Sequence, residues 1–102
     1  MMTVKLLMTW DIKPGKEAEY FDFVVREFVP GLQHVGIQPT EAYLTVYGSG
    51  AQILTGGVAD DLPTMQNILE GEDWHVLQDK LLTFVDNFKK KVVPATGRFQ
   101  LL

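Results

Sequence analysis

Residues 74–92 read WHVLQDKLLTFVDNFKKKV, and the spacing of their apolar side chains decides the fold prediction. These side chains recur at spacings of three, four and seven, which places them on one face of an α-helix. They are Trp74, Leu77, Leu81, Phe84, Val85, Phe88 and Val92. The spacing predicts a long amphipathic helix over 74–92 that packs on a partner surface. Lys89–Lys91 would then lie at its C-terminus, where cations favour the helix dipole.

Outside this stretch, alternating apolar and polar residues predict strands over Val4–Ile12, Glu41–Tyr47 and Ala51–Ala59. A fourth strand is expected over Gly97–Leu102. Glycines interrupt the third strand at Gly56-Gly57. A glycine pair inside a strand predicts either a bulge or a place where another group approaches the backbone closely.

Two further segments have a helical pattern. From about Lys16 the apolar period becomes that of a helix, and Phe23 would project from the side opposite the apolar face. That apolar face comprises Phe21, Val24, Val25, Phe28 and Leu32. Pro30-Gly31 is expected to kink or close this helix. A shorter helix over Leu62–Glu70 is expected to begin at an N-cap in Asp60-Asp61, because aspartate accepts hydrogen bonds from the first turn.

The order of the main elements is strand, helix, strand, strand, helix, strand. Two βαβ halves joined by a hairpin give the ferredoxin-like βαββαβ arrangement, an α+β fold. Right-handed crossovers place both main helices on the same face of one four-stranded antiparallel sheet. A chain of 102 residues suits one such domain, residues 1–102.

Composition narrows the possible functions. Hydrophobic residues make up 46% and charged residues 22%, which is typical of a globular protein. The net charge of −4 argues against a nucleic-acid partner, which would normally meet a basic surface. The absence of cysteine excludes disulfides and thiolate chemistry. We expect a cytoplasmic protein without membrane contact, because neither a signal-peptide pattern nor a membrane-length apolar run is present.

The sheet face away from the helices is too apolar for free solvation and too polar for a dry core. Its residues include Leu7, Thr9, Tyr43, Thr45, Tyr47, Leu54 and Arg98. Two such faces related by a two-fold axis would be self-complementary, so we expect a homodimer that buries them. The alternative is a monomer whose amphipathic sheet stays open to water.

Four features make the chain resemble the dimeric α/β-barrel superfamily, which includes antibiotic-biosynthesis monooxygenases and stress-responsive A/B-barrel proteins. They are the opening strand Val4–Ile12, the turn Lys13-Pro14-Gly15-Lys16 into an aromatic helix, the short helix after Asp61-Leu62-Pro63, and Glu72-Asp73-Trp74-His75 with Leu77 and Leu81. The resemblance spans nearly the whole chain and implies the fold and a homodimer. It leaves the chemistry open, because one fold hosts many functions.

The resemblance also implies a site, since related dimeric-barrel proteins hold small ligands in a cavity between sheet and helices. The candidate lining is Met8, Trp10, Phe21, Val25, Leu44, Trp74, His75 and Leu81. Aromatic density around Trp10, Phe21 and Trp74 favours a small apolar or aromatic ligand. The alternative for each tryptophan is ordinary core packing.

Three functions stay open from the sequence. The first is a homodimer that binds a small apolar or aromatic molecule. The second is a monooxygenase that needs no cofactor, in which His75 acts as the catalytic base on an aromatic substrate. The third is a structural or stress-related dimer without a ligand. No metal site is expected, because His34 and His75 lie far apart without a local ligand motif.

Overall fold

The computed structural model describes residues 3–47 and 50–95, and within these the side chains of all residues except 41–51. The long helical run after the first strand consists of two α-helical segments around one π-helical turn. In chain order the elements are β1 (Val4–Ile12), α1 (Glu17–Phe23), η1 (Val24–Phe28), α2 (Val29–Val35), β2 (Gln38–Tyr47), β3 (Gly50–Ala59), α3 (Leu62–Glu70), α4 (Glu72–Leu81) and β4 (Val85–Pro94).

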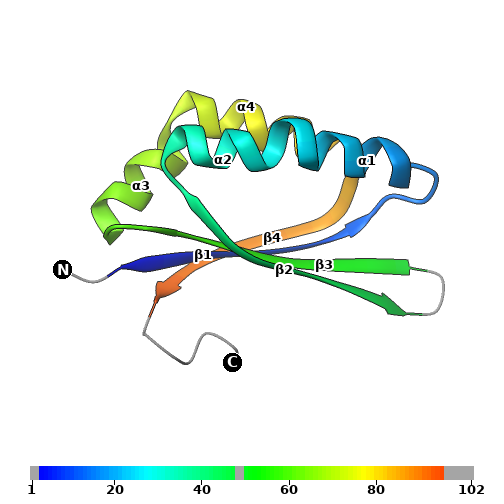
Figure 1. Cartoon of the computed structure of the whole chain (residues 1–102), viewed down its shortest axis with the longest axis horizontal. Coiled ribbons are helices and arrows are strands. Elements are labelled where there is room, and N and C mark those ends of the chain that lie inside the picture. The colour runs from blue at the N-terminus through cyan, green and yellow to red at the C-terminus, as the bar shows by residue number, and fades with distance from the viewer. Residues whose placement is uncertain (1–2, 48–49, 96–102) are drawn as a thin grey trace.

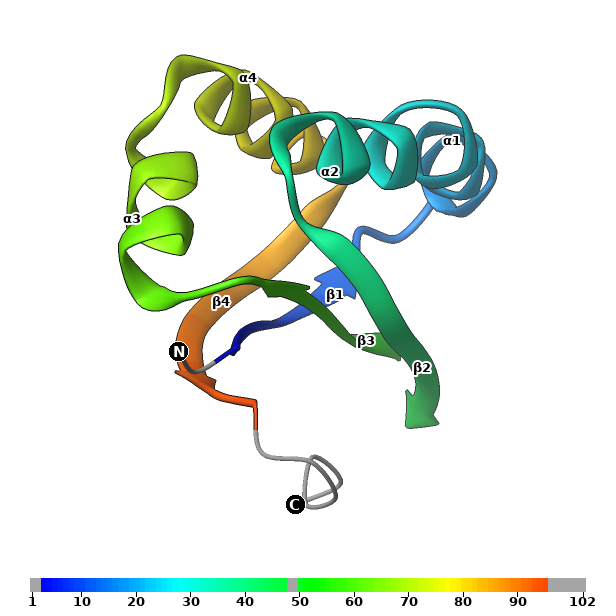
Figure 2. The ribbon, with the colours of Figure 1, turned by 60° about the vertical axis from the view of Figure 1, so that its left-hand side comes forward.

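The four strands form one antiparallel sheet in the order β2-β3-β1-β4. Figure 1 shows the run from α1 to α2 and helix α4 on the same side of this sheet, and Figure 2 shows α3 beside its edge. The predicted α+β class, the four-stranded antiparallel sheet and the one-sided helices are confirmed. In the described ranges, no helix has the length and apolarity needed to cross a bilayer.

The predicted helix over 74–92 is wrong in its second half. Helix α4 ends at Leu81, and a turn follows in which the Phe84 N–H donates to the Leu81 carbonyl at 2.9 Å. The chain then forms β4 alongside β1, so Lys89–Lys91 lie on a strand and not at a helix C-terminus. The strand predicted over 97–102 lies outside the described residues.

A β-bulge explains why β4 has a helix-like spacing. Thr9 pairs with Lys89 and Asp11 with Asp86, so Trp10 faces one residue more on β4 than regular pairing allows. Asn87, within the bulge, has a φ of 58°. The extra residue turns Val85 and Phe88 toward the same face although they are three apart, whereas a regular strand would separate them.

The π-helical turn corrects the predicted face of the first helical run. The Val29 N–H donates to the Val24 carbonyl, five residues back. One added residue means that the position two turns before Phe28 is eight residues back, at Tyr20, and not seven back, at Phe21. Tyr20 is therefore 2% exposed and Phe21 47% exposed.

The same shift affects the neighbouring residues. Val25 is 70% exposed, so its predicted inward position is wrong. Phe23, predicted to project outward, is 3% exposed and packs on Phe28 and Phe84, with ring centroids 5.9 and 5.1 Å apart respectively. Pro30 does not close the helix, which continues to Val35 and ends at Gly36. The wider turn before Pro30 accommodates a residue that lacks an N–H donor.

Two predictions that depend on local sequence are confirmed, the N-cap of α3 and the close backbone approach at Gly57. Asp61 caps α3 by accepting a hydrogen bond from the Thr64 N–H at 2.9 Å. The predicted close approach at Gly57 is confirmed, because a Cβ atom there would collide with the Ile37 side chain. A register shift on β2 lies opposite Gly56 and Gly57.

The helix-face assignment can be tested with two phenylalanines that are two residues apart. We expect Phe23→Ala to lower the free energy of unfolding by about 3–5 kcal/mol, because it leaves a cavity in the core. Phe21→Ala should cost about 1 kcal/mol, mainly through its edge contact with Tyr20. Urea unfolding of both variants measures the difference. A larger loss for Phe21→Ala would restore the regular helix and contradict the π-helical turn.

Candidate functional site

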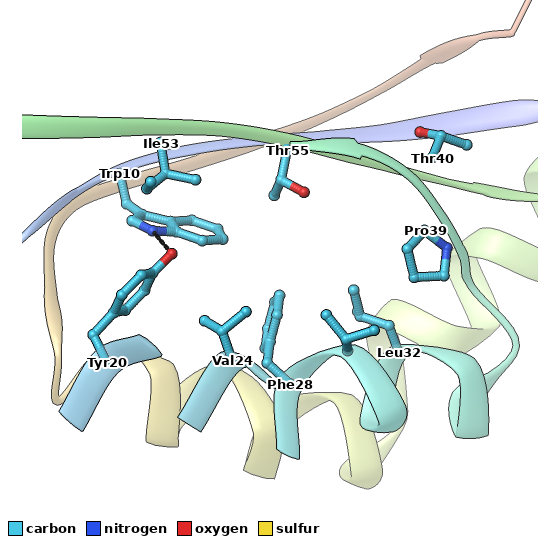
Figure 3. Close-up of a pocket in the computed structure, with 10 residues that line it drawn as sticks. Trp10, Tyr20, Val24, Phe28, Leu32, Pro39, Thr40, Ile53 and Thr55 are labelled. Carbon is cyan, nitrogen blue, oxygen red and sulfur yellow. Dashed lines mark hydrogen bonds between the residues drawn. The ribbon is translucent and has the colours of Figure 1, made fainter. Parts of the chain in front are cut away.

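A cavity of about 280 Å³ lies between the helical run from α1 to α2 and the strands β1, β2 and β3. Figure 3 shows helix side chains facing sheet side chains across it. Its lining consists of Trp10, Tyr20, Val24, Phe28, Val29, Leu32, Pro39, Thr40, Ile53 and Thr55. Only Thr40 among these is exposed, so the cavity lies between the two layers and is partly open to solvent.

A second hollow of about 420 Å³ lies between the start of α3 and the end of β4. Leu62, Pro63 and Pro94 in its wall are exposed, so it is a surface groove. Because more of its lining is buried, the cavity between the layers is the better candidate site.

Trp10 is the fixed wall of the cavity. It lies on the inward face of β1 and is 1% exposed. Its indole stacks on Phe88 with centroids 5.9 Å apart, and it meets Phe28 edge-on at 5.8 Å and Tyr20 edge-on at 6.4 Å. Aromatic pairs at these separations are attractive beyond the area they bury. The indole is thus held by rings from both layers.

A buried hydrogen bond closes one end of the cavity (Figure 3). The Trp10 Nε1–H donates to the Tyr20 hydroxyl oxygen at 2.9 Å. Burial raises the pKa of Tyr20 to about 12, because a phenolate would lose its hydration, and the Trp10 bond opposes this shift only in part. Tyr20 is therefore a neutral phenol at physiological pH. Sequence reasoning missed this residue, because the α-helical period placed Phe21 at its position.

The remaining lining is apolar apart from two hydroxyl groups, those of Thr40 and Thr55. No charged side chain belongs to the described lining. Because a charge in such a cavity would lose its hydration without gaining a counter-ion, the site suits a neutral guest. The described residues also contain no group of three histidines or carboxylates able to hold a metal ion.

Of the predicted lining residues, the structure brings Trp10 to the cavity wall. Met8, Trp74 and Leu81 are at most 1% exposed and belong to the core away from this cavity. Phe21 and Val25 point away from it, for the reason given by the π-helical turn. The side chain of Leu44 lies outside the described residues, although its backbone pairs with Ile53.

His75 does not border the cavity. It is exposed on the first turn of α4, and its Nδ1 lies 2.9 Å from the Gly71 carbonyl oxygen. Helix α4 buries Trp74 and Leu81 against the core, which turns His75 toward the outside. The expectation that His75 borders the space between helix and sheet is therefore wrong.

Three of the residues predicted for a dimer interface lie on the sheet face away from the helices with described side chains. Leu7 and Thr9 are partly exposed, and Leu54, which pairs with Thr9, is 40% exposed. The side chains of the other four lie outside the described part of the structure. These are Tyr43, Thr45, Tyr47 and Arg98. Burial of this face by a partner stays a prediction.

Titration of Tyr20 gives a pH-dependent stability. The unfolded chain releases the phenol proton near the ordinary pKa of 10, and the folded chain only near 12. Because the folded state holds more protons between these values, the stability contributed below pH 10 is lost as pH rises toward 12. We expect Tyr20→Phe to remove a loss of up to about 2–3 kcal/mol. Urea unfolding across this range, compared with wild type, measures it, and parallel curves would contradict the assignment.

No protein-family model matches the chain, and no curated protein matches it by sequence. Solved structures do match. A NIPSNAP family protein from Agrobacterium tumefaciens has a TM-score of 0.69 at 16% identity, covering 99% of this chain and 92% of that one. An uncharacterized NIPSNAP-like domain protein from Burkholderia xenovorans has a TM-score of 0.70 at 14% identity, covering 96% and 89%.

An ethyl tert-butyl ether D (EthD) family protein from Bacillus halodurans has a TM-score of 0.68 at 13% identity, covering 93% of this chain and 100% of that one. At such identities the likeness is one of fold. NIPSNAP and EthD family proteins are members of the dimeric α/β-barrel superfamily, so the predicted resemblance is confirmed at the level of fold.

Proposed function

We propose that this protein is a cytoplasmic homodimer that binds one small apolar or aromatic molecule between its helices and its sheet. The observation that carries the proposal is the cavity of about 280 Å³, walled by Trp10, Tyr20 and Phe28 and free of charged side chains in its described lining. Small-molecule sites are typically concave and mostly apolar, with a few placed polar groups.

The size of the cavity fits a compact guest. An apolar protein cavity of about 150 Å³ holds benzene, so 280 Å³ has room for a molecule of two fused rings. The site is also preformed, because the Trp10 indole is held by three rings and one hydrogen bond. A preformed wall lowers the ordering cost of binding.

The proposed dimer would bury the sheet face that the helices leave open. Leu7 and Leu54 are apolar residues on this face, and neither is fully covered within one chain. An apolar sheet face of this kind is typically covered by a partner. The dimeric α/β-barrel structures that share the fold favour a second copy of this chain as that partner.

The monooxygenase hypothesis receives no support from the cavity. It requires a base beside the substrate, and His75 lies outside the lining. The described polar side-chain groups in the lining are the Trp10 indole N–H and the hydroxyls of Tyr20, Thr40 and Thr55, and none of these is a base at neutral pH. Ligand binding without catalysis is the function that the geometry favours.

Ligand binding can be tested with two adjacent valines. Val24 lines the cavity and Val25 is exposed on the outer face of the same helical run. Indane, a neutral bicyclic hydrocarbon, is the probe, and ligand-observed NMR titration gives its Kd. We expect Val24→Phe to weaken binding about tenfold or more by filling the cavity, and Val25→Phe to leave it unchanged. Equal weakening by the two substitutions, or no weakening by either, would refute the site.

The dimer is tested separately by size-exclusion chromatography with light scattering at micromolar concentration. We expect a mass twice the 11.5 kDa of one chain. Leu54→Lys should shift the protein toward the monomer, because it places two like charges in a self-complementary interface. Val25→Lys, on the opposite layer, is the matched control and should stay dimeric. A wild-type mass equal to one chain would exclude the dimer.

A further inference from the structure

The Tyr20 hydroxyl is a buried polar group in the wall of the cavity. Its oxygen accepts one hydrogen bond, from the Trp10 Nε1–H at 2.9 Å. Among the described residues, no hydrogen bond is donated by the Tyr20 hydroxyl itself. The side chain is 2% exposed and lines the cavity, so an acceptor for this O–H has to come from a molecule within the cavity. A buried donor without a partner is costly, and such groups usually have a specific role.

We propose that the cavity selects a neutral, flat and mostly apolar molecule with one hydrogen-bond acceptor, typically a carbonyl oxygen, which binds the Tyr20 O–H. This inference rests on the proposed ligand-binding function and specifies its ligand class. Trp10 sets the direction of its hydrogen bond with Tyr20, because the indole N–H can only donate. With one lone pair of the Tyr20 oxygen so occupied, an acceptor on the ligand satisfies the remaining O–H, and a donor would not.

The surroundings exclude a charged acceptor. A carboxylate would be a stronger acceptor for the phenol, but it would lose its hydration on entering the cavity. The described lining contains no cationic side chain to compensate for that loss. A ketone, aldehyde or ester carbonyl combines the acceptor with a neutral body.

The shape of the walls favours a planar body. Trp10 and Phe28 meet at an interplanar angle of 88°, so they form a corner of two perpendicular rings (Figure 3). A flat ring in such a corner can stack on one wall and contact the other edge-on. The aliphatic side chains of Val24 and Leu32 continue the same wall from the helical run.

The test compares two probes with the same ring skeleton, the ketone indanone and the hydrocarbon indane. Their Kd values are measured for wild type and Tyr20→Phe by ligand-observed NMR. We expect the preference for indanone over indane to fall about 3- to 10-fold in Tyr20→Phe, as one hydrogen bond is lost, while the Kd of indane is unchanged. Indane carboxylate should bind neither protein.

In Tyr20→Phe the Trp10 N–H loses its acceptor, so the ketone gains an alternative donor. A second pair of variants removes this ambiguity: Trp10→Phe, and Trp10→Phe combined with Tyr20→Phe. Both lack the indole, and they differ only in the Tyr20 hydroxyl. The preference for indanone should be present in the first and lost in the second.

The wild-type protein gives a readout that does not depend on any variant folding. Both probes should move the Trp10 indole N–H resonance through their ring currents, and indanone should add a downfield shift that indane lacks, because a phenol that donates becomes a stronger acceptor. Trp74, the other tryptophan, is buried away from the cavity and is the internal reference.

Equal preference within the second pair of variants, or the same Trp10 shift with saturating indanone as with saturating indane, would overturn the acceptor assignment while indane binding upheld the site. Binding of neither probe would overturn both proposals.

Discussion

The contact of Trp10 with the helical layer is the interaction on which the remaining structure depends. Its indole nitrogen bonds to Tyr20 of α1, its edge meets Phe28 of η1, and its face stacks on Phe88 of β4. One side chain thus ties two strands to two consecutive helical segments. The cavity lies beside this contact, and Trp10, Tyr20 and Phe28 all belong to its lining.

Two irregular turns of the backbone serve this contact. The π-helical turn brings Tyr20 and Phe28 to the same face of the helical run, and the bulge at Asn87 brings Phe88 over the indole. Each irregularity inserts one residue into an otherwise periodic element. Such insertions often occur beside functional sites, where they redirect a side chain. Here both redirect an aromatic ring toward Trp10.

These two inserted residues also explain which parts of the structure could be predicted from the sequence and which could not. The strand at β1, the Asp61 cap and the close approach at Gly57 depend on local chemistry, and all three were predicted correctly. The second half of the 74–92 segment was misassigned, because a bulged strand and a helix share the spacing between Val85 and Phe88. Tyr20 was missed for the same reason, since counting by a fixed period cannot detect one added residue. Trp10 was identified because β1 is regular.

Lys89–Lys91 lie on an edge strand, β4, where they can have a role that they would not have at the end of a helix. β4 is the outermost strand of the described sheet, and Lys89, Lys90 and Lys91 along it are all exposed. An outermost strand offers unpaired backbone groups to other chains, and lysines and a bulge both discourage such pairing. Edge-to-edge aggregation into extended fibres is therefore opposed on this side of the molecule.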